Sequence, residues 1–481
     1  MSKTSKSGIL RNSMTVVVVQ FTGIIVKFFS NIILAWFLTP HDFGIAAIVA
    51  TVFMALTLLS DVGIGDNIVR NPDGEKKDFH QACFNIQILR GLTLYAVLTL
   101  LAAPLAHLYG EDIIRACLQV GGVSLLIDGF LSTRFYSLMR NHEVKKLVLL
   151  DLSAQVISSI LVIIYAMFSP TVWALVLGNV ISSLVKTIGS HLIAPMDFSH
   201  YRFKSARYRQ ILGFGKWIFL ITLFHFIITQ SDKLILGKLV STSELGVYAI
   251  SSALTAITMM LSYNFSLRIL YPVLSEAARG SGEDYADKIH ETMKHILPAL
   301  LIFCLLTFAV APPFFTYLYK ADYIAAGRIT QYLAVMTWFM ILYDLYQKVP
   351  VSCGVPKYTA LFSFVTATSR IGLSIAGFYL WGLEGFILGL AAGSIIGVGL
   401  IQIWMAARDI RPDTYEVRLS ALFVGVFLGN LLLRKELGID HFNEWFAIAL
   451  ILLTAGFGYL SYREPIHRQL ARFGAASRDR S

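Results

Sequence analysis

The chain has 481 residues, of which 56% are hydrophobic and only 15% are charged, and its net charge is +10. A soluble domain carries roughly 25% charged residues, whereas the apolar residues here form blocks that match the ~20 residues of a membrane-spanning helix. These values exclude a soluble globular protein and indicate a polytopic membrane protein.

Fourteen apolar blocks follow one another along the chain. Backbone groups in lipid must be hydrogen-bonded within their own segment, and no long strand-like alternation suggests a barrel, so we predict an all-α membrane protein with about 14 transmembrane helices. The first block is too long for the core of a signal peptide and lacks a small-residue cleavage site. The predicted spans are 16–38, 44–60, 85–107, 112–132, 147–167, 172–193, 214–237, 245–267, 290–314, 325–347, 357–381, 383–406, 419–433 and 443–461, of which the second and thirteenth are short.

The distribution of basic residues predicts the orientation. With the N-terminus in the cytoplasm, 27 of the 40 Lys and Arg lie in cytoplasmic loops and at cytoplasmic helix ends. This is the positive-inside pattern, and it explains the net charge without a nucleic-acid partner. Because the number of predicted spans is even, the C-terminus is also expected in the cytoplasm.

Two stretches of the chain nearly repeat each other. Residues 33–48 read ILAWFLTPHDFGIAAI and residues 235–250 read ILGKLVSTSELGVYAI, 202 positions later. Each copy is expected to contain the end of one span, an external turn and the start of the next span. The copies lie six spans apart, which predicts two parallel lobes related by an axis along the membrane normal. Chance similarity between helices rich in Leu and Ile is the alternative.

The repeat predicts two pseudo-symmetric six-helix lobes followed by two C-terminal helices. The N-terminal lobe is expected over 1–193, a basic cytoplasmic connector over 194–213, the C-terminal lobe over 214–406, and the last two spans with a basic tail over 407–481. The connector alternates basic and aromatic residues, as some proteins that bind single-stranded nucleic acid do. Contact with anionic lipid headgroups, at about 1 kcal/mol per charge, explains this pattern better.

No motif in the chain predicts catalysis, a metal site or a cofactor. The P-loop pattern for binding nucleotide phosphates does not occur. The histidines of HETMKH (290–295) are five positions apart, one more than a helical zinc pair requires, and the four cysteines have no metal-like spacing. No catalytic residue is therefore expected, and the protein is predicted not to be an enzyme.

Ionisable residues inside spans are the informative positions, because they are costly in hydrocarbon and usually face a bundle interior or a wet cavity. Lys27 and Arg370 lie near the middle of their spans, and Lys186 lies well inside the sixth. A phosphate about 4 Å from one ammonium gains about 4 kcal/mol at an effective dielectric constant near 20. We therefore predict a diphosphate-binding cavity lined by Lys27, Arg370, Lys186 and Lys216. Lys216 lies near a cytoplasmic end, where snorkelling to the headgroups is the alternative.

Some of the charges in the spans have an acidic neighbour. Asp232 precedes Lys233, and Asp344 is four positions before Lys348, so both pairs are candidates for neutralisation. Gly389, Gly393 and Gly397 recur every fourth position, which predicts a smooth helix face for close packing against another helix.

The turn motifs resemble a known family. LTPHDFG and DVGIGDNIV (38–69), then SDKLILGKLVSTSELGVYAIS (231–251) and YPVLSE (271–276), are similar to the Wzx-like polysaccharide flippases, the polysaccharide transporter branch of the multidrug/oligosaccharidyl-lipid/polysaccharide exporter superfamily. The resemblance is strongest around the first two spans of each lobe. It implies a bacterial inner-membrane protein that flips undecaprenyl-diphosphate-linked oligosaccharide between leaflets for exopolysaccharide or lipopolysaccharide synthesis.

The same resemblance implies a transport mechanism, a driving ion gradient and partner proteins. The two lobes are expected to expose one site alternately to each side of the membrane, driven by an H+ or Na+ gradient. Asp232 and His225 are the candidate coupling-ion sites, chosen from their depth and charge. A polysaccharide polymerase and export machinery are the expected partners besides the lipid bilayer.

Two other functions stay open at this point. A cation-coupled multidrug exporter of the same superfamily would use deep carboxylates, whereas the carboxylates here lie near span ends. A membrane polysaccharide polymerase or ligase would need acidic residues on a sizeable external loop, where Glu111 and Asp112 are the only candidates.

Overall fold

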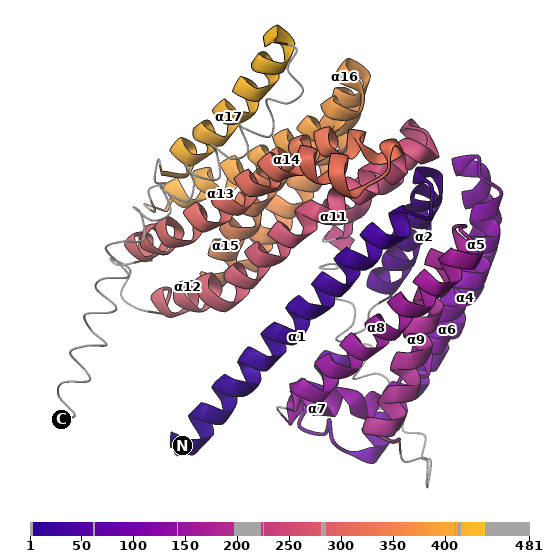
Figure 1. Ribbon diagram of the computed structural model, residues 1–481. Helices are drawn as coiled ribbons and strands as arrows, with labels where there is room; N and C mark the ends of the chain where they lie inside the picture. Colours follow the sequence, from indigo (N-terminus) through magenta and orange to yellow (C-terminus); the bar gives the residue numbers. More distant parts are fainter. Residues whose placement is uncertain are drawn as a thin grey trace, which may run out of the picture. The chain divides into compact units, whose positions relative to one another are not determined.

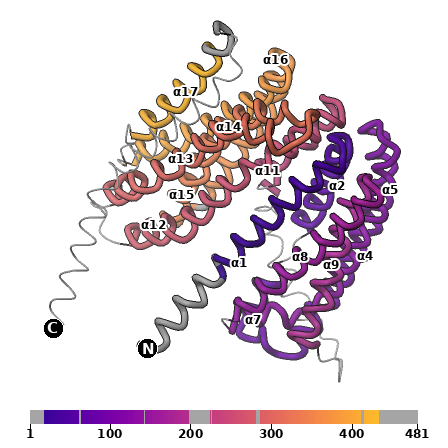
Figure 2. The backbone as a smooth tube through the Cα atoms, viewed as in Figure 1, coloured from indigo at the N-terminus to yellow at the C-terminus, as the bar shows by residue number. Residues whose placement is uncertain are grey.

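A computed structural model of the protein describes residues 3–60, 63–141, 143–196, 223–224, 226–279, 285–408, 410 and 415–437. Every element in these ranges is helical, as Figures 1 and 2 show, which confirms the predicted all-α fold. Most of the predicted connector, the fourteenth span and the C-terminal tail lie outside the described residues. The chain forms two compact units, Met1–Ile250 and Ser251–Ser481.

The first unit consists of helices that pack in neighbouring pairs. Along the chain α1 packs against α8, α8 against α9, and α4 against both α5 and α6. Residues 226–239 are helical and precede α11, whose first turns belong to this unit. The helices of this unit are α1 (Lys3–Ala35), α2 (Pro40–Leu59), α3 (Ile64–Arg70), α4 (Lys77–Tyr109), α5 (Ile113–Gly121), α6 (Val123–Gly129), η1 (Thr133–Tyr136), α7 (Ser137–Arg140), α8 (Val144–Phe168) and α9 (Trp173–Ile193).

The second unit is built around α14, which packs against α13 and α16. Its core is aromatic: the buried Trp338 donates from Nε1 to Ser420 Oγ at 2.9 Å, and Phe308 meets Phe423 edge to face at 6.1 Å between ring centroids. Its elements are α11 (Thr242–Phe265), η2 (Ser266–Leu270), α12 (Tyr271–Ala277), α13 (Tyr285–Leu318), η4 (Ala321–Tyr323), α14 (Ala325–Tyr346), α15 (Lys348–Ser352), α16 (Pro356–Ala406) and α17 (Tyr415–Leu437).

Many of these helices are long and apolar enough to cross a membrane. In the described ranges nine qualify by length and hydropathy, or ten if the bent pair Ile113–Gly129 and Thr133–Arg140 counts as one span. They make the protein a multi-pass membrane protein, as predicted. The total of fourteen stays a prediction, because the described residues omit 443–461 and part of 214–237.

Helix α16 runs through two predicted spans, 357–381 and 383–406, and is broken between them. Trp381 and Gly382 leave helical geometry, and Gly382 has φ 65° and ψ −144°, which side-chain-bearing residues rarely adopt. The two sides of the break then approach closely, because a Cβ at Gly385 would lie 2.1 Å from the Gly377 carbonyl oxygen. The break therefore turns α16 into a helical hairpin.

The glycine repeat packs this hairpin together. A Cβ at Gly389 would lie 2.2 Å from the Leu373 carbonyl oxygen, and one at Gly393 would lie 2.5 Å from the Arg370 Cα. A Cβ at Gly397 would be 2.3 Å from Thr366 Oγ1. The predicted smooth face is confirmed, and its partner is the first half of the same element.

Candidate functional site

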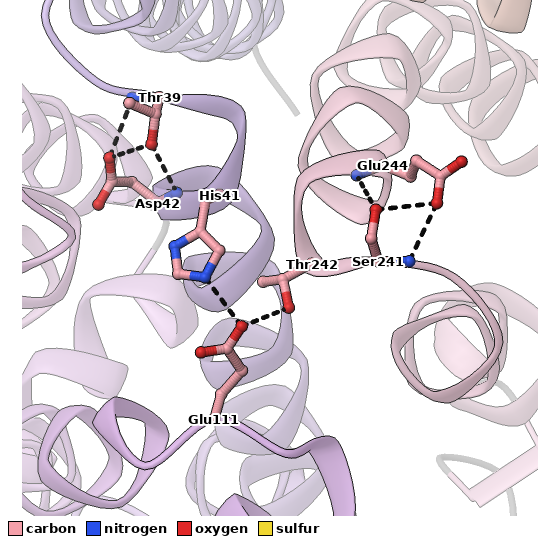
Figure 3. A network of polar contacts seen from close by, with 7 residues as sticks. All are labelled: Thr39, His41, Asp42, Glu111, Ser241, Thr242 and Glu244. Carbon is pink, nitrogen blue, oxygen red and sulfur yellow. Dashed lines mark hydrogen bonds and ion pairs between the residues drawn. The ribbon is translucent and has the colours of Figure 1, made fainter.

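The two copies of the sequence repeat form the same local structure. Thr39 Oγ1 accepts a hydrogen bond from the Asp42 amide at 3.3 Å, while Asp42 Oδ2 accepts from the Thr39 amide at 3.0 Å. Ser241 and Glu244 form the same pair of bonds, at 3.3 and 3.0 Å, as Figure 3 shows. Such a capping box satisfies two amides that the first turn of a helix leaves unpaired. Each copy therefore starts its helix, α2 or α11, with its own cap.

The two capped turns are in direct contact with each other. A Cβ at Gly44 would lie 1.8 Å from the Thr242 carbonyl oxygen, and a Cβ at Gly246 would lie 1.8 Å from the Pro40 carbonyl oxygen. Gly44 and Gly246 occupy the same position of the repeat, so the contact is reciprocal, as in a pair of two-fold related elements. Only glycine allows the two backbones to come so close.

Glu111, in the turn between α4 and α5, contacts both copies (Figure 3). Its Oε1 accepts from Thr242 Oγ1 at 2.8 Å and lies 2.8 Å from His41 Nε2. Desolvation raises the pKa of this carboxyl, but the hydrogen bonds from Thr242 and His41 and the charge of His41 outweigh it, so the pKa lies below its ordinary value. We call these three residues the Glu111 bridge.

Two further hydrogen bonds connect the end of α4 to the helix before the second turn. Lys238 Nζ donates to the Leu108 carbonyl at 2.9 Å, and Tyr109 OH donates to the Leu234 carbonyl at 3.4 Å. A cation at the C-terminal end of a helix is stabilising, because the carbonyl groups there carry partial negative charge. The contacts around Glu111 therefore extend along the helix formed by residues 226–239.

Two lysines of the first unit lie near each other, Lys27 on α1 and Lys233 on the helix formed by residues 226–239. Lys27 is exposed, and the positive charge of Lys233 acts unfavourably on its ammonium. Lys233 Nζ donates to Gln230 Oε1 at 2.8 Å. Neither lysine forms an ion pair with a side chain in the described ranges. The pair is thus a local concentration of positive charge that an anion would stabilise.

The predicted pairing of Asp232 with Lys233 does not form, whereas Asp344 and Lys348 do pair, at 3.3 Å. Asp232 Oδ2 instead accepts from Tyr248 OH at 2.5 Å. Its Oδ1 is buried, and no hydrogen-bond partner for it exists among the described residues. Adjacent residues on a helix do not face each other, whereas residues four apart do, which explains the difference between the two pairs.

Lys186 lies at a different site in the same unit. Its Nζ is 2.7 Å from Asp151 Oδ1, and it lines a cavity of about 570 Å³ between α3, α4, α6 and α9. Arg90 and two carboxylates, Asp66 and Asp128, line the same cavity. The cations there have carboxylates beside them, unlike the Lys27–Lys233 pair.

Arg370 is buried inside the α16 hairpin of the second unit, with 4% of its surface exposed. Its Nη1 donates to the Leu390 carbonyl at 3.1 Å and to Ser394 Oγ at 2.5 Å. The guanidinium thus joins the two halves of the hairpin. Two other predicted site residues, Lys216 and His225, lie outside the described residues.

Lys233 and His41 were not predicted as site residues from the sequence, and Glu111 was predicted only as a candidate catalytic acid. A signal for both turns existed in the repeat itself, because His41 and Thr242 fall inside its two copies. No sequence signal places Glu111 beside them, since it is 70 positions from His41 and 131 from Thr242.

The known sequences that this chain resembles are named for polysaccharide synthesis or transport. A family model described as polysaccharide biosynthesis protein matches residues 33–327. The succinoglycan biosynthesis transport protein ExoT of Rhizobium meliloti (strain 1021) is 22% identical over 438 residues, which are 89% of this chain and 86% of ExoT. The lipopolysaccharide biosynthesis protein WzxC of Escherichia coli (strain K12) is 19% identical over 249 residues, about half of each chain (51% and 50%).

Solved structures show the same fold. The lipid II flippase MurJ in its inward closed conformation has a TM-score of 0.69 at 16% identity, covering 94% of this chain and 100% of that one. An inward-facing multidrug resistance MATE family transporter of the MOP superfamily has a TM-score of 0.62 at 13% identity, covering 81% and 97%. Since the family model spans more than half of the sequence, the chain belongs to the family of polysaccharide biosynthesis proteins, as the resemblance of its turns indicated.

Proposed function

We propose that the protein flips an undecaprenyl-diphosphate-linked oligosaccharide across the bacterial inner membrane for the synthesis of a surface or secreted polysaccharide. Family membership, the names of ExoT and WzxC, and a fold shared with a lipid flippase support this proposal. The protein acts as a transporter, with a lipid-linked sugar as its substrate, rather than as an enzyme.

The observation that carries the proposal is the Lys27–Lys233 pair. Two ammonium groups that repel each other, one in the first predicted span and one in the seventh, are stabilised when a dianion lies between them. Each phosphate–ammonium contact at about 4 Å contributes about 4 kcal/mol at an effective dielectric constant near 20. A diphosphate carries the charge and the two acceptor groups that this pair requires.

The proposed function also includes a transport cycle, a driving ion gradient and partner proteins. The lobes at 1–193 and 214–406 alternate between inward-open and outward-open states, with both termini in the cytoplasm. An H+ or Na+ gradient drives the cycle, and Asp232 and His225 are the candidate coupling sites. The buried, unpaired Oδ1 of Asp232 supports the first of these two residues. A polysaccharide polymerase and the export machinery take the product on the periplasmic side.

The test is binding of undecaprenyl diphosphate to the purified protein in lipid nanodiscs. The double variant Lys27→Gln/Lys233→Gln should bind at least about tenfold more weakly, a loss of about 1.4 kcal/mol, and should fail to restore polysaccharide export in a deletion strain. Lys146→Gln is the matched control, because Lys146 is exposed and pairs with Glu143 at 2.5 Å away from this site. Unchanged binding and export in the double variant would refute the site.

Multidrug export is a second candidate, because the MATE transporter shares the fold. A deletion strain discriminates between the two functions. Altered drug susceptibility with intact surface polysaccharide would support the second candidate, whereas lost polysaccharide with unchanged susceptibility supports the first.

A further inference from the structure

The Glu111 bridge lies where three segments of the first unit meet. We propose that Glu111 is a latch that holds the two copies of the repeated turn together and thereby keeps the external end of the transport path closed. This inference rests on the proposed function, because it assigns the latch a step in the transport cycle. The charge pattern of the sequence places the turns on the external side.

The geometry suits a carboxylate in this position. His41 lies in the first turn of α2 and Thr242 begins α11, so Glu111 sits beside two helix N-termini (Figure 3). The amides there carry partial positive charge, which stabilises an anion. Bonds that involve a charged acceptor are also about twice as strong as neutral ones. One side chain from the α4–α5 turn therefore connects both copies.

The contact can open without unfolding either turn. Each copy is capped by its own residues, Thr39 with Asp42 and Ser241 with Glu244, so neither helix start depends on the other copy. The atoms that come nearest to Gly44 and Gly246 are mostly backbone, and the Thr242 methyl group is the one side-chain group among them. The Glu111 side chain is 25% exposed, so water can replace its partners. Separation therefore breaks the Glu111 bridge together with the Lys238–Leu108 and Tyr109–Leu234 hydrogen bonds, and it leaves the capped turns intact.

The test measures the distance between spin labels across the latch by double electron–electron resonance. Labels at Arg115 on α5 and Ser243 on α11 suit this purpose, because both side chains are exposed. The full-length protein is reconstituted in lipid nanodiscs without substrate, with the exposed Cys353 replaced by Ser to prevent unwanted labelling.

We expect Glu111→Ala to raise the ratio of separated to closed molecules about tenfold, equivalent to about 1.4 kcal/mol. Glu111→Gln should give a smaller rise, since it keeps the acceptor and loses the charge. Thr242→Val, which keeps the side-chain shape and removes one hydroxyl donor, should also favour the separated form. Asp112→Ala is the matched control, because it removes the neighbouring acid outside the bridge, and it should match wild type.

Wild-type distance distributions in both Glu111→Ala and Thr242→Val would overturn the latch. If Glu111→Ala failed to fold, Thr242→Val alone would decide. The measurement contains no cargo, so its outcome is independent of the substrate. A wild-type protein that opens and closes but moves no lipid-linked sugar would refute the proposed function and leave the latch intact.

Discussion

Gly44 and the Thr242 carbonyl are in such close contact that a side chain of even one carbon at residue 44 would lie 1.8 Å from the oxygen. Because the atom at this distance belongs to the backbone, a side chain at residue 44 would push the two backbones apart and could not be accommodated by moving a neighbouring side chain. The same holds for Gly246 and Pro40, so the contact depends on glycine in both copies of the repeat.

Gly44→Ala should therefore prevent the two turns from meeting while each keeps its cap. We expect the label distance between Arg115 and Ser243 to lengthen and polysaccharide export to fall at least about tenfold. Gly399→Ala is the control, because a Cβ at Gly399 meets no atom within 4 Å. A Gly44→Ala protein with wild-type distances and export would show that the close contact is dispensable.

Gly382→Ala should destabilise the second unit. Its φ of 65° with ψ of −144° is a conformation that side-chain-bearing residues adopt only with strain of about 1–3 kcal/mol. A lower thermal unfolding temperature in detergent is the expected result. Gly372→Ala, at a helical position with open space around its Cβ, should leave the unfolding temperature unchanged. Equal unfolding temperatures for the two variants would contradict the assigned strain.

Arg370→Lys tests whether Arg370 serves the hairpin or a ligand. One nitrogen, Nη1, donates to both Leu390 and Ser394, and the ammonium of a lysine would end one bond short of that position, so a loss of about 1–3 kcal/mol of stability is expected. Thermal unfolding measures it, with the exposed Arg115→Lys as control. Normal unfolding combined with weaker undecaprenyl diphosphate binding would instead support the diphosphate role predicted from the sequence.

The pH dependence of the latch follows from the lowered pKa of Glu111. A carboxyl whose pKa is lowered by its partners stabilises the closed form above its ordinary pKa, and this stabilisation is lost as the pH falls through the lowered value. On α2 the facing titratable group is His41, whose Nε2–H donates whether the ring is neutral or charged. On α11 the facing group is the neutral Thr242, while Lys238 of the preceding helix binds the Leu108 carbonyl.

The label distance between Arg115 and Ser243 should therefore stay short from neutral pH down to the ordinary glutamate pKa of 4.5 and lengthen only below it. Glu111→Gln should lack this acid transition. A transition centred near neutral pH would show that a group other than Glu111 controls the contact.

Features encoded over short stretches of sequence could be predicted. The helices follow from apolar block length, the glycine face from its spacing of four, and the Asp344–Lys348 pair from helical geometry. The repeat also indicated matching turns, and each is capped by residues within four positions of one another. These features depend on local geometry, which composition and spacing determine.

Contacts between distant segments could not be predicted in this way. Asp232 was a candidate partner for Lys233, but neighbours on a helix point in different directions, and Lys233 instead acts on the charge of Lys27. Arg370 was expected to line a cavity. Instead, the glycine face in the second half of α16 packs closely against the backbone of Arg370 in the first half. Which side chains meet depends on helix packing, and a single sequence does not specify the rotation of each helix.

The two capping boxes, Thr39 with Asp42 and Ser241 with Glu244, also imply an order of assembly. Each cap closes a loop of only four residues, so it can form as soon as its segment leaves the ribosome and enters the bilayer. The glycine–carbonyl contact joins residues about 200 positions apart, and loop-closure entropy makes such a contact slow to form. The first turn therefore forms before the second turn has been synthesised, and the contact between them forms afterwards.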